Sequence, residues 1–330
     1  MRENPRTRCT AALLLMSLLA ACGGVVPDEP GEVADAAPME TEPMAAIATN
    51  AFYYYADVDG AWRFYTETLG FETVADFGFA KILQVAPTSY LTLVDAAEGM
   101  HSADEPRSVT LAIVTDELEG WWEYLSAAGV PMEHEFEPAE GRPHQGFVAT
   151  DPEGYFLEFE RFEPHPENER LLPALAALEP VHPPADLDTR RPADLGVRAT
   201  VLWLYYEDTA AANDFYTRLL GIEPIVDQGW AWGYRSSPSG LIGIVDEVRG
   251  MHQATEDKAV TVSFFVERVE EMVEVLRGVE GFEFRSESVG DESGRVRTLV
   301  GYDPEGYFLE WDTFVQAEGN ERLLQLLADR

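Results

Sequence analysis

The sequence predicts an α+β protein in which four βαβββ units form two cupped mixed β-sheets with helices outside. An internal repeat carries the prediction, because "DPEGYFLEFE" at 151–160 returns as "DPEGYFLEWD" at 303–312, about 150 residues later. "RFYTETLGFE" and "VDAAEGMHSA" likewise return as "DFYTRLLGIE" and "VDEVRGMHQA". The second observation is that each repeat restarts its own pattern halfway, so the chain holds four similar units.

The elements of the first repeat follow from its hydrophobic periodicity. "NAFYYYAD" is rich enough in aromatic residues for a strand. A helix at 59–69 places Ala61, Phe64, Tyr65 and Leu69 on one face, and Gly70 ends it. The remaining elements are strands at 71–78, 79–86, 89–95 and 108–114, a helix at 117–128 closed by Gly129, and a final hairpin through Asp-Pro-Glu-Gly into "YFLEFE".

Composition and the repeat divide the chain into five parts. These are a signal peptide (1–21), a disordered acidic tether (22–48), a first domain (49–178), a Pro-rich linker (179–195) and a second domain (196–330). The units can pair in chain order or exchange between the domains, and the tandem domains can act as an internal dimer. The sequence does not decide between these pairings.

The N-terminus predicts a lipid anchor. Basic residues precede the apolar run "CTAALLLMSLLA", which is too short to span a bilayer comfortably, and Leu19-Ala20-Ala21-Cys22 resembles the lipobox of bacterial lipoproteins. Lipidated Cys22 would place the protein in the cell envelope, on the periplasmic face of the outer membrane if the organism has one. The alternative is a secretory signal cut nearby, with Cys22 incidental.

The charge balance restricts the partners. The chain has 23 Lys and Arg residues against 60 Asp and Glu residues, a net charge of −37. Such a surface repels phosphate backbones, which argues against nucleic-acid binding. It either concentrates cationic ligands near a cleft or only keeps the protein soluble.

The repeated order of strand, "FYxxxLGFE"-like helix end, three strands, second helix and "DPEGxxxE" resembles the vicinal oxygen chelate superfamily, which includes glyoxalase I, extradiol dioxygenases and bleomycin-binding proteins. The resemblance covers nearly all of 49–162 and 200–314. It implies cupped sheets, each with a divalent metal held by His, Glu or Gln side chains. Because this fold carries many unrelated activities, the resemblance predicts fold rather than function.

The ligand positions implied by the resemblance retain one carboxylate per repeat, Glu158 or Glu310. The other positions hold Asn50, Thr92 and Val109 in the first repeat and Val201, Gly243 and Thr261 in the second. One carboxylate does not make a specific metal site, so we expect no metal and treat Glu158 and Glu310 as remnants of one. Arg297, near Asp312 and diagonal to Glu310, is expected to neutralise the second carboxylate.

Strand alternation predicts aromatic cups for a flat apolar or cationic ligand. The expected ligand-binding side chains are Phe52, Tyr54, Glu158, Trp203, Tyr205, Trp230, Trp232, Arg297, Glu310 and Asp312. The tryptophans make the second repeat the favoured pocket, although aromatic residues also fill ordinary cores. His101 and His252, in the repeated "GMH" loop, are candidate general bases or lids, or simply solvated.

Two functions follow from these observations. The first is a metal-free module that binds or sequesters a small aromatic or cationic molecule. The alternative is a glyoxalase-like metal-dependent lyase, isomerase or dioxygenase.

Overall fold

The computed structural model describes residues 46–329, all of which fall within one compact unit. The predicted signal peptide, Cys22 and most of the predicted tether lie outside the described residues. Within the described part, no helix is long and apolar enough to cross a membrane.

The first repeat folds into two βαβββ units whose helices are short. Asp57 caps the first helix by accepting a hydrogen bond from the Gly60 N–H, and Gly70, with φ of 67°, ends the helical segment after a π-helical turn. The first unit comprises β1 (Ala48–Tyr55), α1 (Val58–Arg63), η1 (Phe64–Thr68), β2 (Glu72–Asp76), β3 (Ala80–Ala86) and β4 (Ser89–Asp95). The second comprises β5 (Val109–Val114), α2 (Leu118–Ala127), β6 (Met132–His134), β7 (His144–Thr150) and β8 (Phe156–Phe162), followed by η2 (Pro166–Asn168) and α3 (Leu171–Ala176).

The second repeat follows the same plan. Asp208 caps its first helix as Asp57 does, and Gly221 ends that helix with φ of 65°. The third unit comprises β9 (Ala199–Tyr206), α4 (Thr209–Leu220), β10 (Val226–Asp227), β11 (Ala231–Arg235) and β12 (Gly240–Asp246). The fourth comprises β13 (Val260–Phe265), α5 (Val269–Arg277), β14 (Glu283–Phe284), β15 (Gly290–Glu292), β16 (Val296–Tyr302) and β17 (Phe308–Phe314), followed by α6 (Glu321–Ala328). The predicted α+β fold with two cupped mixed sheets is confirmed.

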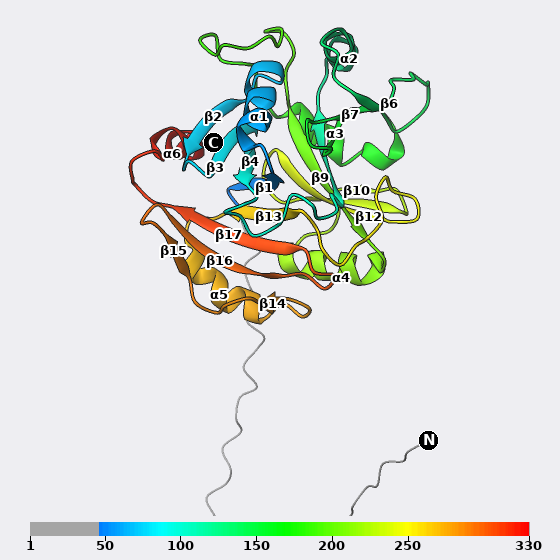
Figure 1. Ribbon diagram of the computed structural model, residues 1–330. Helices are drawn as coiled ribbons and strands as arrows, with labels where there is room; N and C mark the ends of the chain where they lie inside the picture. The colour runs from blue at the N-terminus through cyan, green and yellow to red at the C-terminus, as the bar shows by residue number, and fades with distance from the viewer. Residues whose placement is uncertain (1–45, 330) are drawn as a thin grey trace, which may run out of the picture. The chain divides into compact units, whose positions relative to one another are not determined.

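The units exchange between the two repeats, which answers the question that the sequence left open. One sheet has the order β14-β16-β17-β13-β1-β4-β3-β2, with β15 paired to β16, and therefore joins the first unit to the fourth. The other has the order β10-β11-β12-β9-β5-β8-β7-β6 and joins the third unit to the second. Figure 1 shows the consequence, since blue β1, from the beginning of the described chain, lies beside golden β13, which is followed in the sheet by orange β17. We call the concave faces of these two sheets cup A and cup B, in that order.

Each sheet is centred on an antiparallel pair of first strands. In cup A this pair is β1 and β13, with Phe52 opposite Thr261. In cup B it is β5 and β9, with Thr110 opposite Trp203. Every sheet therefore takes one half from each repeat.

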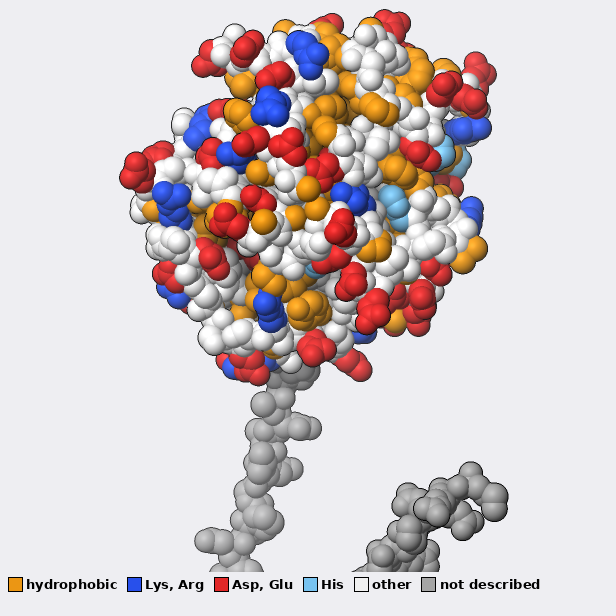
Figure 2. All heavy atoms as spheres, viewed as in Figure 1, with side chains coloured by type: hydrophobic (Ala, Val, Ile, Leu, Met, Phe, Trp, Pro, Cys, Tyr) orange, Lys and Arg blue, Asp and Glu red, His pale blue; other side chains and the backbone are white. Residues whose placement is uncertain are grey.

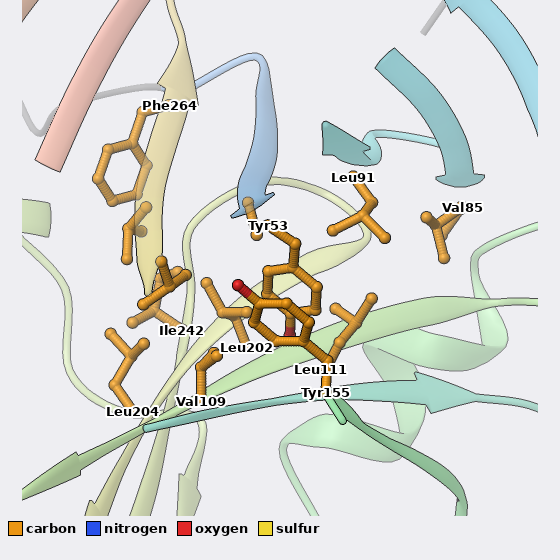
Figure 3. Close-up of a cluster of buried hydrophobic side chains, with 14 of the residues drawn as sticks. Tyr53, Val85, Leu91, Val109, Leu111, Tyr155, Leu202, Leu204, Ile242 and Phe264 are labelled. Carbon is orange, nitrogen blue, oxygen red and sulfur yellow. The ribbon is translucent and has the colours of Figure 1, made fainter. Parts of the chain in front are cut away.

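The main hydrophobic core lies between the convex faces of the two sheets. Tyr53 of β1 stacks on Tyr155, with ring centroids 3.9 Å apart and an interplanar angle of 9°. Figure 3 shows these rings surrounded by aliphatic side chains from both sheets, including Leu91 of β4 and Leu111 of β5. Because the core is shared, neither sheet buries its convex face without the other.

The repeated Asp-Pro-Glu-Gly-Tyr turn fastens the two sheets together. Asp151 accepts hydrogen bonds from Tyr55 and Tyr65 of the first unit, at 2.7 and 3.0 Å, while its other carboxylate oxygen accepts from the Tyr155 N–H. The Tyr155 hydroxyl accepts from the Tyr54 N–H and donates to the Ala259 carbonyl. We call this arrangement, and its copy around Asp303 and Tyr307, the turn clamp.

The terminal helix of each repeat packs against one cup. Leu171 and Leu175 of α3 join the apolar cluster of cup B, and Leu323 and Leu327 of α6 join the corresponding cluster of cup A. Figure 1 shows α6 beside β2, where Arg322 forms an ion pair with Glu72 at 2.7 Å. Figure 2 shows Asp and Glu side chains spread over the visible face, with fewer Lys and Arg among them.

Candidate functional site

Cup A holds a cavity of about 560 Å³ that opens to solvent. Its walls are mostly aromatic and aliphatic, from the first unit and the fourth. Phe52 and Tyr54 of β1 face it, opposite Phe308 and Phe314 of β17. Since small-molecule sites occupy a few hundred to about 1,000 Å³, this cavity has the volume of one.

Two carboxyl groups lie side by side on the cavity wall. Glu310 and Asp312 are two positions apart on β17, so strand alternation directs both into the cup. Asp312 is 1% exposed, and one of its oxygens accepts a hydrogen bond from the Ser263 hydroxyl at 2.6 Å. Its Oδ1 atom is buried and has no hydrogen-bond partner among the described residues.

The two carboxyl groups cannot both ionise easily. Burial raises the pKa of Asp312 to about 6, despite the Ser263 hydrogen bond. Burial, together with the neighbouring Asp312, raises the pKa of Glu310 well above its ordinary value. Like charges this close disfavour a second ionisation, so the pair favours a state with a single negative charge, and the Ser263 hydrogen bond favours Asp312 as its bearer.

Neutral side chains complete the wall around the pair. The Tyr54 hydroxyl is hydrogen-bonded to the Thr261 hydroxyl at 2.7 Å. Thr92 donates to the Asn50 side-chain oxygen at 3.1 Å, and the Asn50 amide nitrogen has no partner within the described chain. The cup thus offers hydroxyl and amide groups around a single negative charge.

The cavity mouth combines apolar and charged side chains. Phe79 and Met100 are 41% and 48% exposed there. Arg285 stacks over Phe308 and Arg295 over Phe77, with guanidinium-to-ring distances of 5.6 and 5.4 Å. Glu98 and Glu292 also line the cavity, so charged residues of both signs surround it.

Cup B has the same plan but is filled. The Trp203 side chain is 7% exposed and lies over Gly243 of β12, where an added Cβ would stand 1.9 Å from the indole. Phe52 and Thr92 hold these two places in cup A. A second carboxyl pair, Glu158 and Glu160, occupies β8; burial raises the pKa of Glu158 to about 7 and that of Glu160 further above its ordinary value.

The exchange of units corrects the expected grouping of site residues. Trp203 and Tyr205 were expected to share one cup with Glu310 and Asp312, because all four belong to the second repeat. They belong to cup B, with Glu158, whereas Glu310 and Asp312 belong to cup A. The tryptophans of the second repeat, which favoured it as the pocket, do not line the cavity; Phe52 and Tyr54 of the first repeat do, together with side chains of the second.

Arg297 does not neutralise the carboxyl pair as expected. It lies opposite Thr313, while Thr298 lies opposite Asp312, so the Arg297 side chain leaves the other face of the sheet. There it forms an ion pair with Glu270 of α5 at 2.9 Å. The expected register was one residue out, and one residue reverses the face.

Two further tryptophans lie away from the cavity. Trp230 precedes β11 and packs against the cup B cluster, with the Arg249 guanidinium 4.7 Å from its ring. Trp232 and Tyr234 pack into the main core on the convex side. Trp230 and Trp232 were expected to bind the ligand, but neither lines the cavity, and Trp230 lies in the turn before the strand, where alternation does not apply.

The two loop histidines occupy matching places beside the cup tyrosines. His101 contacts the Tyr54 ring edge-on at 4.9 Å and is hydrogen-bonded through Nδ1 to Glu105 at 2.7 Å. His252 contacts Tyr205 at 5.0 Å, and burial lowers its pKa to about 4. Both Nε2 atoms are buried, so the histidines pack against the cups rather than lie free in solvent.

The residues at the implied ligand positions do not fit the family's metal site. Cup A brings together Asn50, Thr92, Thr261 and Glu310, which offer one carboxyl group among neutral amide and hydroxyl groups. Across residues 46–329, no group of three or more His, Cys, Asp or Glu side chains is arranged to hold a metal ion. Hard or borderline divalent ions need several convergent anionic or imidazole donors, which this set does not supply.

The pairing of βαβββ units, with a cavity on the concave face, defines the chain as a cupped-sheet protein of paired units. Residues 47–159 match the model of the Glyoxalase/Bleomycin resistance protein/Dioxygenase superfamily. The second repeat extends the same architecture to the rest of the fold.

Solved structures agree over most of the chain. A presumed dioxygenase from Bacillus subtilis is 16% identical with a TM-score of 0.57, over 83% of this chain and 86% of its own. Glyoxalase I from Zea mays is 17% identical with a TM-score of 0.55, over 84% of this chain and 94% of its own. No curated protein sequence matches significantly. At these identities the structures establish the fold alone.

Several cavity residues escaped the sequence reasoning. Phe77, Phe79 and Met100 come from turns and loops, where strand alternation makes no prediction. Ser263 faces the cup by alternation on β13, but its role depends on pairing with β17 of the same sheet. For Ser263, only the order of the strands could have shown that it lies beside Asp312.

Proposed function

We propose that this protein binds or sequesters a small aromatic or cationic molecule in cup A without a resident metal. The cavity carries the proposal: aromatic side chains surround one net negative charge, at the Glu310–Asp312 pair. Aromatic rings favour flat or cationic ligands by stacking and cation–π contacts, and a buried charge favours an opposite one. The excess of Asp and Glu over the whole chain adds long-range attraction for cations.

A screen of aromatic cations by thermal shift tests this proposal. A bound ligand raises the melting temperature in proportion to the logarithm of its concentration above the Kd. A Phe52→Ala variant should lose most of the shift, because Phe52 lines the cavity. Equal shifts in the variant and the unchanged protein would contradict binding in cup A.

The second candidate is a glyoxalase-like lyase or isomerase, or a dioxygenase, that uses a divalent metal. The similarity to glyoxalase I over most of the chain favours it. Elemental analysis of the purified protein separates the two candidates. About one tightly held divalent metal per chain would support the enzyme and contradict a metal-free binding protein.

We also propose that lipidated Cys22 anchors the protein in the cell envelope, on the periplasmic face of an outer membrane where one exists. The basic start, the short apolar run and Leu19-Ala20-Ala21-Cys22 support this proposal. A Cys22→Ser variant should move from the membrane to the soluble fraction. An unchanged partition would show that Cys22 carries no anchor.

A further inference from the structure

The carboxyl pair in cup A has no positive partner, and this determines the charge that the cavity can accept. Arg297 lies on the opposite face with Glu270. In the described chain, no Lys or Arg forms an ion pair with Glu310 or Asp312, and the guanidinium of Arg285, which lines the same cavity, stacks over Phe308. Two buried carboxyl groups without a counterion cannot both remain charged.

The pair is also asymmetric. Ser263 donates to one oxygen of Asp312, which stabilises its ionised form, while no described side chain other than Asp312 is hydrogen-bonded to Glu310. Glu310 is therefore the member of the pair that more readily keeps its proton. The remaining Asp312 oxygen, Oδ1, is a buried acceptor without a donor. A buried acceptor of this kind is costly until a donor reaches it.

From this geometry we infer that cup A selects a monocation that carries an N–H donor, such as a primary ammonium group on an aromatic body. The N–H group donates to Asp312 Oδ1, and the protonated Glu310 stays neutral beside it. A quaternary ammonium offers no donor, and a neutral isostere offers no charge. The inference rests on the proposed function, because it specifies the ligand of the same cavity.

Other charged groups around the pair do not alter this conclusion. Glu292 acts on both carboxyl groups and further disfavours a second negative charge, while Arg285 acts in the opposite direction on Glu310. Glu98 and Arg295 also line the cavity, one an acidic and the other a basic side chain, so together they add no net charge to its wall. Tyr54 is held by Thr261, and His101 by Glu105, so neither is hydrogen-bonded to the pair.

The inference predicts a particular pH dependence. Asp312 must be ionised to accept the ammonium group, so affinity should be constant above about pH 6 and fall about tenfold per pH unit below it. Below that pH, binding of one ammonium ion releases one proton. 2-Phenylethylammonium remains cationic over this range, so its own titration does not interfere.

Calorimetric titration of the full chain with three probes tests the inference. The probes are 2-phenylethylammonium, its N,N,N-trimethyl analogue and 2-phenylethanol, each measured between pH 5 and pH 8. We expect the primary ammonium to bind about tenfold or more tightly than the other two, since a hydrogen bond to a charged group has that effect. Equal binding of the trimethyl analogue overturns the N–H requirement, and equal binding of the alcohol overturns charge recognition.

Matched variants assign the roles within the pair. Asp312→Asn should weaken ammonium binding about 10- to 100-fold and remove its pH dependence. Glu310→Gln should leave both the affinity and its pH dependence unchanged. Glu160→Gln, at the Asp312 place in filled cup B, is the control and should bind as the unchanged protein does. The reverse order of effects at Asp312 and Glu310 overturns the assignment. If Asp312→Asn does not fold, the probe and pH series on the unchanged chain still decide.

The outcomes separate this inference from the proposed function. Binding of all three probes with equal affinity leaves an aromatic-binding cavity and removes only the claim about charge. Binding of none of them, with no thermal shift from any other aromatic cation, contradicts the proposed function as well.

Discussion

At the residue scale, one pair of substitutions between the repeats distinguishes an open cup from a filled one. Trp203 and Gly243 face each other in cup B, where the indole lies over the glycine. Phe52 and Thr92 hold the same places in cup A. The smaller ring leaves space beside the carboxyl pair, so the cavity lies in the cup without a tryptophan at this position.

The Trp203→Ala and Phe52→Ala variants should therefore behave in opposite ways. Removing the buried Trp203 side chain should cost about 3–5 kcal/mol of unfolding free energy and leave ligand affinity unchanged. Phe52→Ala should weaken binding of an aromatic cation by a few-fold to about thirtyfold, with a smaller loss of stability. Urea denaturation and calorimetric titration measure the two effects. Loss of binding in Trp203→Ala would place the site in cup B.

These side chains can be predicted as site residues from the sequence, but the residues that share a cup with each of them cannot. Periodicity placed Phe52, Tyr54, Glu310 and Asp312 on concave strand faces, since alternation is a local property. The grouping of these residues depends on pairing between β1 and β13, which are more than 200 residues apart in sequence. Both possible pairings satisfy the same local pattern, so no local signal distinguished them.

At the scale of elements, the turn clamp explains why the Asp-Pro-Glu-Gly-Tyr hairpin occurs twice. Each copy begins in one sheet and is hydrogen-bonded to the first strand of the other. Tyr307, like Tyr155, accepts from a backbone N–H of a first strand, that of Tyr205, and donates to the Ser108 carbonyl. The hairpin thus joins the two sheets, whereas the glutamate that follows it faces a cup.

Removal of one clamp hydroxyl should loosen the contact between the sheets. Tyr307→Phe leaves the Tyr205 N–H and the Ser108 carbonyl without their partner, which should cost about 1–3 kcal/mol of unfolding free energy. Tyr302→Phe, on the neighbouring strand outside the clamp, is the control and should cost less. If urea denaturation gives equal losses of unfolding free energy for the two variants, the clamp hydroxyl stabilises the fold no more than an ordinary tyrosine hydroxyl does.

At the scale of the whole molecule, six buried or half-buried carboxyl groups of the described residues have raised pKa values. They belong to the two clamps and the two cups, and burial is the first cause in each case: Asp151, Glu158, Glu160, Asp303, Glu310 and Asp312. The net charge of −37 adds repulsion among ionised groups. Buried carboxyl groups of this kind make the folded state less tolerant of high pH than of mild acid.

Stability should therefore fall as pH rises from about 4 to about 7. The pKa is about 6 for Asp303 and about 7 for Glu158, above ordinary values near 4, so the folded chain holds more protons than the unfolded chain in this window. This contribution is complete below about pH 4 and is lost as pH rises through the folded-state pKa values. Urea denaturation across this range measures it, and Glu158→Gln with Glu160→Gln should flatten the slope. A slope equal to that of the unchanged protein would contradict the assignment to cup B.

The exchange of units also determines when the cavity can exist during synthesis. Cup A needs β1, at the beginning of the described chain, and β17, near its end. A ribosome that has released only the first repeat has made half of each sheet, and a truncated chain lacks the carboxyl pair altogether. Contacts of such long sequence separation form slowly, because a long loop must close before they stabilise anything. The chain can therefore bind a ligand in cup A only after β17 has been synthesised and has joined the sheet that contains β1.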